Sequence, residues 1–153
     1  MREAIGGTFL FNIMIVFIFF FTAFLAIAIN YSQAFRIKNQ VINYIEQYEG
    51  MNETSEEEII EYINSSGYYR NVDCSCMEGN DYRCGGNNDN TGSNVHLSSD
   101  SSRKAKGLCI KKLSNSNGDT YYRVTTFVSF NLPIVGEFLK LPVKGETKVI
   151  TND

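Results

Sequence analysis

Four cysteines are the residues of this sequence with the clearest chemistry. Cys74, Cys76, Cys84 and Cys109 all follow a long apolar segment near the N-terminus. An even number of cysteines in a small exported domain favours disulfide bridges, and four cysteines allow three pairings. A zinc site and free thiols are the alternatives, but Cys74 and Cys76 are separated by one residue instead of the roughly two to four usual in zinc sites, and no second pair follows. We therefore expect disulfides whose pairing the sequence leaves open.

Catalytic motifs do not occur in the sequence. The single histidine, His96, has no G-x-S-x-G serine to activate, and there is no P-loop, HExxH or Rossmann glycine pattern. The carboxylates Glu56 and Glu58 lie at a predicted helix start and do not converge on a cleft. We expect neither an enzyme nor a site for a cofactor or small-molecule substrate.

Segment 87–98 has a weak similarity to a calcium-binding loop. Asn87, Asp89 and Thr91 alternate before Gly92. However, Ser98 occupies the position where such a loop has a bidentate glutamate. A polar turn is the better interpretation, so no metal site is predicted.

Residues 9–29 form an uncharged apolar segment in which only Asn12 and Thr22 have strong hydrogen-bonding side chains. Crossing a bilayer takes about 20 apolar residues in a helix, whereas the apolar core of a secretory signal has about 7–15. We predict a retained transmembrane segment at residues 1–30. Cleavage as a signal peptide is the alternative, because Ala26-Ile27-Ala28 resembles a signal-peptidase site.

The transmembrane segment is predicted to continue as a helix over residues 31–49. Neither proline nor glycine occurs in this range before Gly50, which is expected to terminate the helix. Apolar residues recur at helical spacing and give one stripe on a polar helix. The stripe consists of Ala34, Ile37, Val41, Tyr44, Ile45 and Tyr48.

A second, short helix is predicted at residues 55–66. Ser55 and Glu58 form a capping-box pattern, and Gly67 closes the segment. Residues 73–106 are then rich in Asn, Asp, Ser and Gly and contain three of the four cysteines, so we expect an irregular, cysteine-stapled loop.

Residues 107–151 change to the period of two that is typical of strands. Strands are expected at 107–113, 120–130 and 141–150, with Asn117-Gly118 as the first hairpin turn. The segment 133–141 is predicted to be a short crossover or partial helix. One face of the middle strand, with Tyr122, Val124, Val128 and Phe130, is expected to pack on the helix stripe. The fold class is therefore α+β, a long helix on a small antiparallel sheet of three to four strands.

Charge is distributed unevenly along the chain. Residues 39–100 hold two basic and twelve acidic side chains, a balance of −10, while residues 101–153 hold nine basic and four acidic ones, a balance of +5. The overall charge of −3 does not indicate a nucleic-acid partner. The two halves are either ordinary solvated surfaces or complementary surfaces that join copies of the chain. In the second case the acidic residues Glu53 to Glu61 are expected to face a basic patch around Lys140, Lys144 and Lys148 of another copy.

A helix that is half membrane and half amphipathic, carrying a small sheet, resembles type IV pilins and pseudopilins. The segments GGTFLFNIMIVFIFFF, INYSQAFRIKNQVINYIE and FVSFNLPIVGEFLKLPVKGETKVI are most similar to the TadE-like branch of pilus proteins. The resemblance implies an exported pilin-like domain at residues 31–153 and cleavage beside Gly6, Gly7 and Thr8. The family has a glutamate at the fifth position after that cleavage. A cut after Gly7 places Asn12 at that position and a cut after Gly6 places Phe11 there, which leaves processing open.

The resemblance implies a structural subunit of a pilus, export or adhesion apparatus that associates with itself or with other pilin-like subunits. If the cysteines are bridged, the domain faces an oxidising exterior and the N-terminus is cytoplasmic. The residues expected to mediate helix assembly are Asn12, Phe17, Phe20, Phe24 and Tyr31. The contact face is expected on the side of the helix that carries Phe11, Phe17, Phe20, Phe24, Tyr31 and Ala34. The alternatives are a monomeric, membrane-tethered binding domain with a disulfide-stapled loop, and a domain secreted after signal cleavage.

Overall fold

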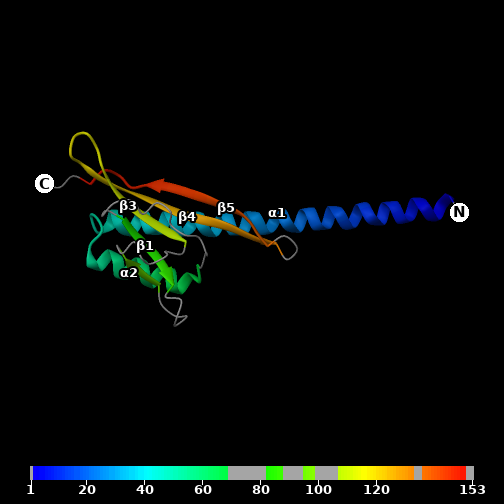
Figure 1. The fold of residues 1–153 in the computed structure, drawn as a ribbon, viewed down its shortest axis with the longest axis horizontal. Helices are drawn as coiled ribbons and strands as arrows, with labels where there is room; N and C mark the ends of the chain where they lie inside the picture. The colour runs from blue at the N-terminus through cyan, green and yellow to red at the C-terminus, as the bar shows by residue number, and fades with distance from the viewer. Residues whose placement is uncertain (1, 69–81, 88–94, 99–106, 133–135, 151–153) are drawn as a thin grey trace.

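The computed structural model describes residues 2–68, 82–87, 95–98, 107–132 and 136–150. A long helix projects from a small α+β domain (Figure 1). The five strands form one antiparallel sheet in the order β2-β1-β3-β4-β5. The elements are α1 (Arg2–Gln47), α2 (Glu53–Ser66), β1 (Tyr82–Asn87), β2 (Val95–Ser98), β3 (Leu108–Ser114), β4 (Thr120–Leu132) and β5 (Gly136–Glu146).

Helix α1 is continuous over 46 residues, which confirms that the apolar and amphipathic segments form one helix. It ends at Gln47, two residues before the predicted end. The left-handed residue there is Glu49, with φ 55°, and the N–H of Gly50 donates to the carbonyl of Ile45 at 2.9 Å. This bond closes the helix end by capping a free carbonyl. Glycine is still required at position 50, because its φ is 137° and a Cβ would lie 3.3 Å from the hydroxyl of Tyr122.

Helix α2 begins earlier than predicted. Asn52, and not Ser55, is the N-cap: its side chain accepts from the N–H of Ser55 at 2.8 Å, and the Ser55 hydroxyl accepts from the N–H of Asn52 at 2.9 Å. Asparagine caps a helix as well as serine does, so Ser55 takes the third helical position and is buried. Gly67 ends the helix in the left-handed conformation, with φ 63°.

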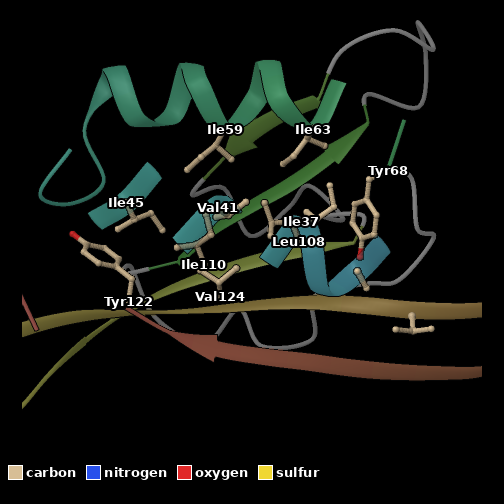
Figure 2. Close-up of a cluster of buried hydrophobic side chains, with 12 residues drawn as sticks. Ile37, Val41, Ile45, Ile59, Ile63, Tyr68, Leu108, Ile110, Tyr122 and Val124 are labelled. Atoms are coloured by element: carbon tan, nitrogen blue, oxygen red, sulfur yellow. The ribbon is translucent and has the colours of Figure 1, made fainter. Parts of the chain in front are cut away.

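The core lies where α1 passes between α2 and the strands β4 and β5 (Figure 2). Val124 and Val128 are fully buried in it, and the hydroxyl of Thr126 between them donates to the carbonyl of Ala34 at 3.0 Å. The predicted packing of the strand face on the helix stripe is confirmed for Ile37, Val41, Ile45, Tyr122, Val124 and Val128. Tyr48 is half-buried outside this cluster, and the side chain of Phe130 lies outside the described residues.

The sheet differs from the prediction at both edges. Two short strands, β1 and β2, occur within the segment expected to be an irregular loop. The prediction of a short crossover or partial helix at residues 133–141 is also wrong from residue 136 onwards, because Gly136–Glu146 is one strand. Pro142 lies within β5, the edge strand, where a missing N–H does not interrupt the sheet.

Tyr68 continues the sheet where β3 stops. Its hydroxyl accepts a hydrogen bond from the N–H of Phe127 at 2.9 Å and donates to the carbonyl of Phe127 at 2.8 Å. The carbonyl of Gly107, at 3.1 Å, is a second acceptor for the same hydroxyl. The last residue of β4 paired with β3 is Thr126, so the tyrosine supplies the hydrogen bonds of a strand that has ended. A buried side chain thereby satisfies backbone groups that would otherwise be unpaired.

Helix α1 approaches β5 closely at one glycine. A Cβ on Gly145 would lie 2.8 Å from both Cδ1 of Ile42 and Cδ of Lys38. Lys38 is buried along its stem, and its ammonium lies 4.2 Å from the ring centroid of Phe35. The lysine thus covers apolar surface with its chain and satisfies its charge on an aromatic face.

Candidate assembly surface

The N-terminal half of α1 is an exposed apolar rod. Large apolar side chains from Phe9 to Ile29, with the exception of Ile15, are between 45% and 77% exposed, on all sides of the helix. Helix residues Gly6–Gln47 include the one candidate membrane span found among the described residues, with a mean hydropathy of 2.7 and no part of that window buried. The helix is therefore long and apolar enough to cross a bilayer, and this surface must be covered by lipid or by protein.

The polar side chains on this rod differ in whether they form hydrogen bonds within the helix. Thr22 donates to the carbonyls of Ile18 and Phe19, and Asn30 donates to that of Ala26, so both satisfy themselves within the helix. Asn12 has no side-chain hydrogen bond to any described residue. An exposed carboxamide within an apolar segment is satisfied best by a polar group of another helix.

Gly6 and Gly7 have open space around them. A Cβ at either position would meet nothing within 4 Å. Packing among the described residues therefore gives no reason for glycine here. Small residues on an apolar helix permit the close approach of a second helix, and these two precede Asn12 by about one to two turns.

The predicted assembly residues are all accessible. Phe17, Phe20, Phe24 and Tyr31 are between 52% and 77% exposed. At helical spacing they share a face with Ala34, which was grouped with them in the prediction of a contact face. That grouping is wrong, because Ala34 is fully buried against the sheet. The face therefore points to the side of α1 on which the sheet lies.

An acidic stripe runs along the outer side of α2. Glu53, Glu57 and Glu61 recur at every fourth position and are exposed, opposite the buried Ile59 and Ile63. Their carboxylates form no ion pair or hydrogen bond with any described residue. Like charges at this spacing repel by about 0.2–0.5 kcal/mol per pair, so the stripe weakens the isolated helix. The spacing of four is already present in the sequence.

Basic side chains lie on the opposite side of the molecule. Lys144 is exposed on the sheet face that points away from α1, and Lys148 follows β5 with 88% of its side chain exposed. Lys148 lies 3.8 Å from Glu46, and Arg123 is paired with Glu146 at 2.7 Å. Helix α2 and strand β5 lie on opposite sides of α1 in both views (Figures 1 and 2), so the acidic stripe is directed away from these lysines. The side chain of Lys140, the remaining member of the expected basic patch, lies outside the described residues.

The sheet register brings two of the four cysteines together. Cys84 of β1 is the direct partner of Cys109 of β3, and Cys109 is 2% exposed. Cys74 and Cys76 lie outside the described residues, as do Asp89, Thr91 and Gly92 of the calcium-like segment. His96 is on β2 opposite Gly86. Among the described residues no group of three or more His, Cys, Asp or Glu is placed to hold a metal ion.

Comparison with models of protein families, with characterised proteins and with solved structures finds no match. The arrangement of a long apolar helix and a small antiparallel sheet is compatible with a pilin-like fold.

Proposed function

We propose that this chain is a pilin-like or pseudopilin-like structural subunit, with the TadE-like branch as its nearest resemblance. The observation that carries the proposal is the unbroken α1, whose apolar half is exposed on every side while its other half forms the core of the domain. A simple anchor needs no rigid connection between membrane and domain, and a flexible linker would serve it. A rigid helix instead fixes how the domain is presented to neighbouring subunits.

Contacts between helices are supported by the polar and small residues on the rod. Asn12 offers a carboxamide with no partner among the described residues, and Gly6 and Gly7 leave room for a second backbone. A hydrogen bond between helices in a membrane contributes about 0.6–2 kcal/mol. Association through Asn12 therefore replaces the charge pairing that a glutamate provides in the resembled family.

The domains are proposed to add a charged contact to the helix contact. The acidic stripe Glu53, Glu57 and Glu61 of one copy faces Lys144 and Lys148 of the next. Because the two surfaces lie on opposite sides of one molecule, such a contact is head-to-tail and repeats from copy to copy. Exposed pairs of this kind are screened by salt, so this part of the association should weaken as ionic strength rises.

The domain is proposed to lie outside the membrane, with the N-terminus cytoplasmic and a disulfide between Cys84 and Cys109. Their direct pairing across two strands and the burial of Cys109 support this bridge. Formation removes two electrons and two protons from the thiols, and a disulfide-carrying oxidoreductase of the oxidising exterior would accept them. Counting thiols in denatured, unreduced protein should give no more than two; four free thiols would contradict both the bridge and the outside location argued from it.

Photo-cross-linking in native membranes tests the assembly. A photoreactive amino acid replaces Ser32 or Asn39, two exposed positions of α1 just above the apolar segment. The matched control replaces Ser116, which is exposed in the β3–β4 turn at the far end of the domain. Cross-links to a second copy or to one discrete protein from the α1 positions, above the yield at Ser116, are expected. If the α1 positions yield none, the chain is a monomeric tethered domain and the pilin-like proposal fails.

A further inference from the structure

The hairpin formed by β4 and β5 continues well beyond the core. The last core residue of β4 is Val128, yet the paired strands extend to Leu132 and Gly136. Figure 1 shows this part of the hairpin alongside α1, directed toward the N-terminal end of the helix. It is rich in apolar residues, namely Phe130, Leu132, Phe138 and Leu139.

The position of the hairpin end along α1 follows from the strand rise. Gly145 lies beside Lys38 and Ile42, and Gly136 precedes it by nine residues with one irregularity in the ladder. At the usual strand rise this is about 25–30 Å. The same length is about 17–20 residues of helix, so Gly136 lies roughly level with residues 20–25 of α1. The hairpin end therefore overlaps the apolar segment.

The position of the bilayer along α1 follows from its length. The hydrocarbon core is about 30 Å thick and needs about 20 helical residues. The charged residues Arg2 and Glu3 precede the apolar segment, and about 20 residues counted from Ala4 reach Ala23. The outer boundary of the hydrocarbon then falls at the level of the hairpin end.

We propose that the far end of the β4–β5 hairpin contacts the outer head-group region of the bilayer beside α1. The protein meets the lipid surface through two elements, a spanning helix and the end of a hairpin. The free edge of β5 limits the depth: unpaired backbone groups are not tolerated in hydrocarbon, whereas apolar side chains beside polar backbone suit the head-group region.

Side chains around the hairpin match this placement. Phe24 of α1 is 61% exposed at the proposed boundary, and Tyr31, about 12 Å farther out, is 52% exposed. Aromatic side chains are enriched at the head-group level of membrane proteins, where one side of the ring is apolar and the other wet. The proposal requires that α1 crosses the bilayer, and it does not require association with other subunits.

Tryptophan fluorescence tests the proposal, because the chain contains no tryptophan. The full chain with Leu132→Trp is placed in phosphatidylcholine vesicles, with or without phosphatidylcholine that carries a nitroxide quencher near its head group. Ser116→Trp, at the opposite end of the domain, is the negative control, and Phe19→Trp in the span is the positive one. Phe130→Trp is a second hairpin probe that keeps an aromatic residue if Leu132→Trp does not fold.

The expected result is blue-shifted emission and strong loss of fluorescence at the hairpin, unchanged when protein is diluted into more lipid. Quenching at the hairpin no greater than at Ser116→Trp would overturn the proposal. A blue shift that disappears on dilution, without lipid quenching, would also overturn it and show that a second copy covers the hairpin. Cross-links from Ser32 and Asn39 remain a separate readout, so failure here leaves the assembly proposal standing on its own test.

Discussion

Val128→Asp is the perturbation that tests most sharply how the sheet packs on α1. Val128 is fully buried in the cluster that includes Ile37 and Val124. Removing its apolar side chain forfeits about 1.5–3 kcal/mol. The new carboxyl escapes an unpaired buried charge by binding a proton, which at pH 7 costs about 4 kcal/mol from its ordinary pKa. The total of about 5–7 kcal/mol is comparable with the whole stability of a small domain.

Thermal unfolding followed by near-ultraviolet tyrosine circular dichroism measures this loss. That signal reports the buried Tyr68 and Tyr122 and not the helicity of the membrane segment. The aspartate is neutral in the folded state and ionised in the unfolded one, so rising pH favours unfolding. The difference from wild type should shrink by about 2–3 kcal/mol between pH 7 and pH 5.

Thr125→Asp is the matched control for Val128→Asp. Thr125 belongs to the same strand but to the opposite, partly exposed face, where its direct neighbour is Lys144. An opposite charge across the strands should leave stability within about 1 kcal/mol of wild type. Equal, small losses in the two variants would refute the packing of this strand face on α1.

Three further changes test other contacts. Gly145→Ala should destabilise the domain by about 1–3 kcal/mol, because its Cβ would overlap Lys38 and Ile42, whereas Gly7→Ala should leave thermal unfolding unchanged. Tyr68→Phe leaves the N–H and carbonyl of Phe127 without their partner and should cost about 1–3 kcal/mol in the same assay. In membrane cross-linking, Glu57→Lys should lower the yield of cross-links between copies at low salt. Adding Lys144→Glu to the same chain should restore that yield. If the losses caused by the two substitutions add instead, the charged contact is excluded.

Sequence patterns predicted the elements that depend on local periodicity. The period of the apolar stripe predicted where α1 enters the core, and alternation along β4 identified Val124 and Val128 as its inward residues. The αL residue at Gly67 and the hairpin at Asn117-Gly118 also follow from local chemistry, because few other residues adopt a positive φ.

What sequence could not predict depends on contacts between distant segments. Tyr68 supplies the hydrogen bonds of a missing strand only because its hydroxyl lies beside the backbone of Phe127, which is 59 residues away in the sequence. Gly145 matters only because α1 passes over β5 at that point. The pairing of Cys84 with Cys109 required the strand β1, which the turn-like composition of its surroundings concealed. The acidic stripe and the lysines Lys144 and Lys148 lie on opposite sides of the molecule because α1 lies between α2 and the sheet. This order of layers could not be read from the sequence.

A photo-cross-linking scan of single positions from residue 9 to residue 29 tests the central claim, that α1 is an assembly helix. Each variant carries one photoreactive side chain in native membranes, and protein adducts are compared with lipid adducts. The assembly account predicts protein adducts that recur every three to four residues on a face that includes Asn12, and their loss in Asn12→Leu probed at neighbouring positions. Lipid adducts alone at every position around the helix would contradict the account and leave α1 as an anchor.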